Sequence, residues 1–118
     1  MATLVMGTVD EGRKYTVRLT NTSSKGTVLL IVGWVPKQAH MVPSSSTVNV
    51  APASPPVERR GTVPDFDDAR RMTIVASLDH GGTAKLEVLQ DDQSLVDALD
   101  QDLTETTTWE FIVNQVGP

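Results

Sequence analysis

The chain has 118 residues, of which 39% are hydrophobic and 21% charged, so it fits one globular domain better than a disordered segment. The absence of cysteine excludes disulfides, thiolate metal sites and a cysteine nucleophile. The net charge of −5 and the scattered Arg and Lys pairs argue against nucleic-acid binding, and no apolar run is long enough to span a bilayer.

The first third of the chain predicts three strands. Thr3 to Val9 is a weak strand pattern, and the first residues lack the basic and apolar regions of a signal peptide, which favours a cytoplasmic location. Lys14 to Thr20 alternates apolar and polar residues and predicts a strand with one buried face. A turn over Asn21–Gly26 then leads to Val28–Val32, whose continuous apolar run is typical of a central or interface strand.

Trp34 ends this apolar run and is a candidate ligand-binding residue. An exposed, flat aromatic ring can stack on the apolar face of a sugar. A tryptophan next to an apolar strand is also a common core residue, so both interpretations stand at this point.

The segment from Pro36 to Pro64 contains six of the seven prolines and a run of three serines. We expect a long surface connection, interrupted by a short strand over Thr47–Val50. Its length makes it a candidate functional or assembly loop, and it contains His40.

Two groups of acidic residues are candidate calcium ligands, because calcium takes several carboxylate and carbonyl oxygens from loops. The alternative is that these acids belong to solvated turns or helix starts. Asp65 is also placed to cap a short helix over Asp65–Arg71. The five candidates are Asp65, Asp67, Asp68, Asp91 and Asp92.

The second half of the chain predicts three further strands by alternation, over Met72–Leu78, Ala84–Val88 and Thr108–Asn114. Asp79–Gly82, which includes His80, is expected to close a hairpin. Ser94–Leu99 has the pattern of a short amphipathic helix. The predicted core comprises Tyr15, Val17, Leu19, Ile74, Ala76, Leu86, Val88, Trp109, Phe111 and Val113.

About seven short strands separated by turns predict an all-β fold. We expect a single-domain β-sandwich over residues 1–118, of immunoglobulin-like or jelly-roll type, with one or two short helices. A closed barrel is the alternative architecture.

Charge is unevenly distributed along the chain. Residues 1–85 contain 10 basic and 7 acidic residues, whereas residues 86–118 contain 8 acidic residues and no Lys or Arg. This separation favours electrostatically guided packing against a partner or between subunits.

No catalytic set is apparent, because His40 and His80 are the only histidines and no nucleophile motif accompanies them. The sequence therefore favours a non-enzymatic assembly or protein-interaction module, either a homo-oligomer or one that binds another protein. The alternatives are a lectin-like module that binds carbohydrate or calcium and, more weakly, a small hydrolase using His40 or His80. No cofactor is expected other than this candidate calcium.

Overall fold

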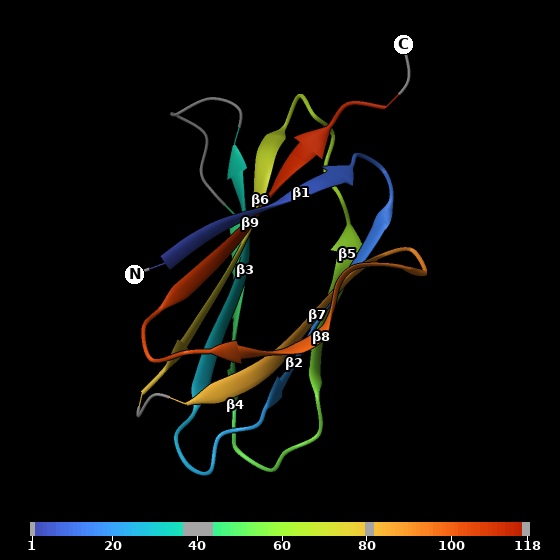
Figure 1. The fold of residues 1–118 in the computed structure, drawn as a ribbon. Coiled ribbons are helices and arrows are strands. Elements are labelled where there is room, and N and C mark those ends of the chain that lie inside the picture. Colours follow the sequence, from blue (N-terminus) through green and yellow to red (C-terminus); the bar gives the residue numbers. More distant parts are fainter. Residues whose placement is uncertain (1, 37–43, 80–81, 117–118) are drawn as a thin grey trace.

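The computed structural model describes residues 2–36, 44–79 and 82–116, and it consists of strands joined by turns (Figure 1). The strands are β1 (Ala2–Asp10), β2 (Lys14–Asn21), β3 (Val28–Pro36), β4 (Ser44–Val50), β5 (Val57–Thr62), β6 (Ala69–Leu78), β7 (Thr83–Gln90), β8 (Gln93–Asp102) and β9 (Thr107–Asn114).

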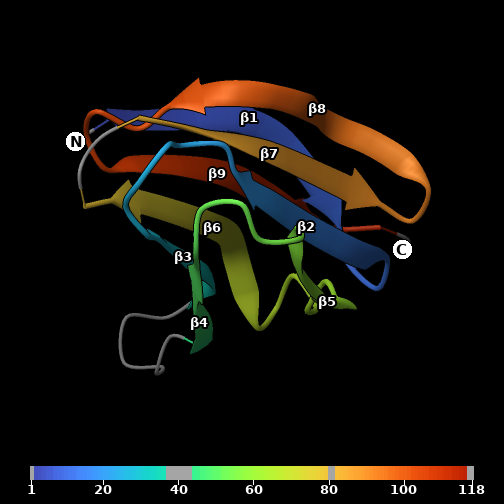
Figure 2. The ribbon, with the colours of Figure 1, turned by 90° about the horizontal axis from the view of Figure 1, so that it is seen from below.

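The strands form two packed sheets, which confirms the predicted β-sandwich (Figure 2). Sheet A has the order β1-β9-β6-β3-β4, and sheet B has the order β5-β2-β7-β8. Among the described strands, only β3–β4 and β7–β8 are hairpins of consecutive strands. At every other connection the chain crosses between the sheets, so strands distant in sequence become neighbours.

The core lies between the two sheets and follows the predicted alternation. In β2, β6, β7 and β9, every second side chain is buried, and Trp109 and Phe111 are the largest buried groups. All the predicted core residues are buried except Tyr15, which is half-buried and packs against the core.

Neither predicted helix forms in the described residues. Asp65 accepts backbone hydrogen bonds from Asp68 (2.8 Å) and Ala69 (3.0 Å), but this single turn stops where β6 begins to pair with β3. Ser94–Leu99 lies within β8, where Val96 is buried opposite Val88. In both segments, pairing with a neighbouring strand overrides the local helical pattern.

The connection from Pro36 to Pro64 is more regular than expected, because it contains two strands. β4 includes the serine run and pairs with β3 from Trp34 to Val28, and β5 pairs with β2. The segment thus supplies one edge of each sheet. The hairpin predicted at Asp79–Gly82 is wrong, since β6 and β7 lie in different sheets.

No helix in the described part of the chain is long and apolar enough to cross a membrane.

Candidate functional site

In the described part of the chain, the edge strands are β1 and β4 in sheet A and β5 and β8 in sheet B. An edge strand leaves half of its backbone N–H and C=O groups unpaired by its own sheet, and another strand can pair with them. Natural sheets block this pairing with charged side chains, short strands or irregular register. The four edges of this protein differ sharply in how far they are blocked.

The β5 edge is blocked by charge. Arg59 lies opposite Val17, which is fully buried, so the arginine side chain points between the sheets. Its Nε atom is buried with no hydrogen-bond partner among the described residues. An additional strand beside β5 would enclose this inward charge further, which disfavours pairing.

The β8 and β4 edges are protected in other ways. β8 carries the exposed acids Asp97 and Asp102, and its register with β7 shifts at two places. β4 is seven residues long and exposes the polar side chains of Thr47 and Asn49.

The β1 edge has few of these features. It is nine residues long and contains no charged residue from Ala2 to Val9. Leu4, Val5 and Met6 are exposed by 44%, 66% and 42%. The one irregularity is a register shift against β9 between Val5 and Gly7. A long, uncharged, apolar edge is the kind that accepts another strand.

Apolar side chains line both faces of β1. Leu4 pairs in register with Trp109, which faces the interior, whereas Val5 pairs with Glu110 on the outer face of sheet A. Leu4 nevertheless remains exposed, because β1 is the last strand of its sheet. The side chains of an added strand would therefore lie next to an apolar side chain of β1 on each face of sheet A.

Two further exposed hydrophobic residues lie beside β1 or near its C-terminal end. Ile112 of β9 lies beside Thr8, and the backbone N–H of Val116 donates to Glu11 Oε1 (3.0 Å) at the end of β1. We call the group Leu4, Val5, Met6, Ile112 and Val116 the β1 edge surface. It contains five of the seven large exposed hydrophobic residues in the described part of the chain; the other two are Leu29 and Val35 of β3.

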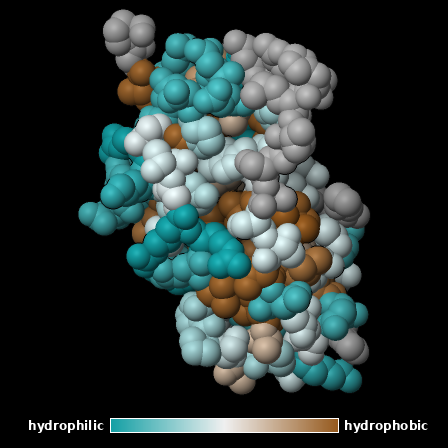
Figure 3. All heavy atoms as spheres, turned by 180° about the vertical axis from the view of Figure 1, so that it is seen from behind, coloured by the Kyte–Doolittle hydropathy of each residue, from teal (hydrophilic) through white to brown (hydrophobic). Residues whose placement is uncertain are grey.

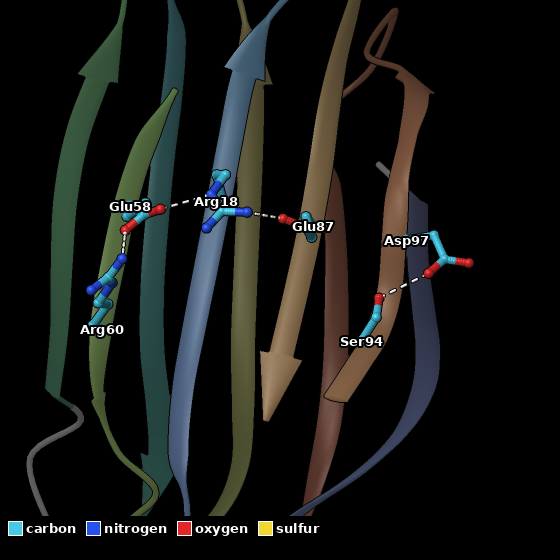
Figure 4. Close-up of polar contacts among 6 residues, drawn as sticks. All are labelled: Arg18, Glu58, Arg60, Glu87, Ser94 and Asp97. Atoms are coloured by element: carbon cyan, nitrogen blue, oxygen red, sulfur yellow. Dashed lines mark hydrogen bonds and ion pairs between the residues drawn. The ribbon is translucent and has the colours of Figure 1, made fainter. Parts of the chain in front are cut away.

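The β1 edge lies on the same side of the sandwich as the acidic β8 edge (Figures 1 and 2). Asp97 accepts a hydrogen bond from the Ser94 hydroxyl (2.9 Å) and projects beyond β8, away from the strands at the centre of sheet B (Figure 4). Asp102 is also exposed, and its carboxylate accepts a hydrogen bond from the backbone N–H of Thr104 (3.0 Å). An apolar edge and an acidic edge thus lie on the same side of the sandwich.

The opposite side of the sandwich carries the β4 and β5 edges. Figure 3 shows hydrophobic groups near the middle of this side, bordered by hydrophilic ones. Among the residues near these edges, Val48 and Val57 are partly buried and pack against the core.

The outer face of sheet B carries a row of alternating charges across three strands (Figure 4). Arg18 donates from Nε to Glu58 on β5 (2.7 Å) and from Nη1 to Glu87 on β7. Arg60 also pairs with Glu58. The hydrogen bond from Arg18 is the main cause that lowers the pKa of Glu58, and the same bond raises the pKa of Arg18.

An open hollow of about 560 Å³ lies at one end of sheet B, where β2, β5 and the β7–β8 turn meet. Tyr15, Lys14, Arg60 and Asp92 line it. The Tyr15 ring covers Gly61, since a Cβ added there would meet the tyrosine hydroxyl at 2.8 Å. The hollow combines basic and acidic groups and has no single dominant charge.

Trp34 does not line this hollow. It is half-buried, packs against the core and makes an edge-to-face contact with Tyr15, with ring centroids 5.3 Å apart. The proposed role of Trp34 in sugar binding stays a prediction.

The candidate calcium ligands occupy two separate turns. The Asp91 carboxylate accepts hydrogen bonds from Arg13 Nε (2.5 Å) and from the backbone N–H of Lys14 (3.2 Å). The hydrogen bond from Arg13 is the largest cause that lowers the pKa of Asp91. Asp92 is its exposed neighbour.

Asp65, Asp67 and Asp68 lie together, exposed, on the β5–β6 connection. Within the described ranges, no group of three or more acidic or histidine side chains is arranged to hold a metal ion.

His40 and His80, the histidines of the hydrolase alternative, lie outside the described residues.

Sequence reasoning missed the β1 edge. The pattern of Thr3 to Val9 predicts only a weak strand, and the lack of charged residues in it is the available signal. A lack of charge favours strand addition only where the strand lies at the edge of a sheet. The edge position of β1 in sheet A is shown by the fold.

No family model, curated protein or solved structure matches this chain.

Proposed function

We propose that this protein is a non-enzymatic interaction module that binds another polypeptide by strand addition along β1. The observation that carries this proposal is the nine-residue β1 edge, which is uncharged from Ala2 to Val9 and exposes apolar side chains on both faces. In strand addition, main-chain hydrogen bonds supply affinity and alternate side chains supply specificity.

The contrast with the other edges supports the proposal. β5 and β8 carry charges that oppose pairing, and β4 exposes polar side chains. The neighbouring Ile112 and Val116 extend the apolar area beyond β1 itself. Apolar surface gathered at one open edge is typical of an interaction site.

The direct test uses a capped nine-residue peptide of alternating threonine and valine as a neutral strand. We expect it to bind the wild-type protein and to slow amide hydrogen exchange in β1. Val5→Lys should weaken binding by at least about tenfold, or about 1.4 kcal/mol, because the ammonium group would be desolvated beside the added strand.

Val35→Lys is the matched control. Val35 is 40% exposed on the outer face of sheet A but belongs to β3, which is separated from β1 by β6 and β9. It should leave peptide binding unchanged. Equal losses for both variants, or slowed exchange at another strand in place of β1, would overturn the proposal.

A further inference from the structure

We infer that the strand bound along β1 belongs to a basic polypeptide segment, in which Lys or Arg alternates with apolar residues. This inference rests on the proposed function and adds the chemistry of the partner. It follows from the position of the acidic β8 edge on the same side of the sandwich as the apolar β1 edge.

A strand paired with β1 would present its side chains alternately to two surroundings. Those on the outer side would continue the surface formed by Val5 and Ile112, where the charge of the neighbouring Glu110 is paired with Arg71. Those on the inner side would lie next to Leu4 and face the flank toward β8. The apolar side chains of the partner fit the first position, and its charged ones fit the second.

The charges on this flank are acidic. Asp97 and Asp102 are exposed on β8, and the one basic residue of β7, Lys85, lies opposite Asp100 in the register of these two strands. The bonds they accept, from Ser94 and Thr104, come from uncharged donors. Basic side chains on the added strand would therefore complement the flank.

A second copy of this chain fits the same edge less well. Its own β1 brings no basic residue, and two-fold pairing of β1 with β1 would place two acidic β8 flanks on the same side of the joint sheet. Self-association is thus a competing outcome of the experiment.

The experiment compares three capped nine-residue peptides in which valine alternates with lysine, threonine or glutamate. We expect the lysine peptide to bind about three- to tenfold more tightly than the threonine peptide, and the glutamate peptide to bind more weakly, since exposed ion pairs have modest strength. The advantage of lysine should diminish at about 0.5 M salt, where exposed charges are strongly screened.

The double variant Asp97→Asn/Asp102→Asn should reduce the preference for lysine to less than about twofold while leaving binding of the threonine peptide unchanged. The matched control is Asp65→Asn/Asp68→Asn, which removes two exposed acids from the β5–β6 connection. This control should retain the preference.

The outcomes separate the two proposals. If no peptide slows exchange in β1, the proposed function fails and the inference fails with it. If the threonine peptide binds but charge has no effect, the inference is overturned and strand addition stands. If β1 amides become protected only as the concentration of the protein itself rises, the occupant is a second copy and the basic partner is wrong.

Discussion

Arg18 and Glu58 illustrate how single side chains on the outer face of sheet B depend on neighbours from other strands. Glu58 and Glu87 flank the arginine because β5 and β7 pair with opposite sides of β2. Opposite charges placed directly across neighbouring strands stabilise a sheet. The row joins residues that are distant in sequence, since Arg18 and Glu58 are 40 positions apart.

The lowered pKa of Glu58 gives a prediction with a definite sign. Its contribution to stability is fully present above the ordinary value of 4.5 and is lost as the pH falls through the lower pKa of the folded state. Glu58→Gln should therefore lower Tm at pH 7. The gap between variant and wild type should close as the pH falls below 4.5, as measured by thermal melts from pH 7 to pH 2. A gap that stays constant over this range would contradict the role of the carboxylate.

At the scale of the element, the edge strands differ in the side chains that they expose to solvent. β5 combines an inward arginine with the outward charges of Glu58 and Arg60. β1, by contrast, has no charged residue from Ala2 to Val9. The edge strands β1 and β5 thus expose opposite kinds of side chain, apolar on β1 and charged on β5.

The inward side chain of Arg59 provides the prediction at this scale. Arg59→Val should increase self-association at high protein concentration without lowering Tm, because it removes both the inward charge and a buried Nε that has no described partner. Light scattering across a concentration series measures the first effect, and thermal melts measure the second.

Arg59→Lys is the control for this substitution, since it retains an inward charge, and it should remain as dispersed as the wild type. If the valine variant shows no more association than the lysine variant, another feature protects the β5 edge.

At the scale of the whole molecule, both sheets share one core. Val17 and Leu86 from sheet B and Ile74 and Phe111 from sheet A belong to the same buried cluster. A loss of packing on one sheet is therefore transmitted to the other, and the molecule should unfold as one unit.

Phe111→Ala tests this shared core. The ring is 1% exposed, so the substitution should lower the free energy of unfolding by about 3–5 kcal/mol. Urea unfolding followed by far-UV circular dichroism and by tryptophan fluorescence should give coincident transitions.

Ile112→Ala, on the next residue of β9 but 46% exposed, is the matched control and should cost less than about 1 kcal/mol. Similar losses for both variants, or transitions that separate, would contradict a single core with this register.

The amino-acid sequence determined the strands in which polar and apolar residues alternate and the buried side chains that they supply. Tyr15, Val17 and Leu19 share a face because side chains alternate along any strand, whatever its neighbours. Local capping and spacing patterns also predicted helices at Asp65–Arg71 and Ser94–Leu99, and both predictions are wrong because pairing with β3 or β7 outweighs the helical pattern.

Only the tertiary structure decided which strands form the edges. Six crossings between the sheets separate consecutive strands, and they place β1 beside β9 and on the same side as β8. The apolar character of Leu4 to Met6 can be read from the sequence, but its exposure at a sheet edge follows only from the strand order of the described residues. Strand order depends on the packing of the whole chain, and for that reason local pattern alone does not determine it.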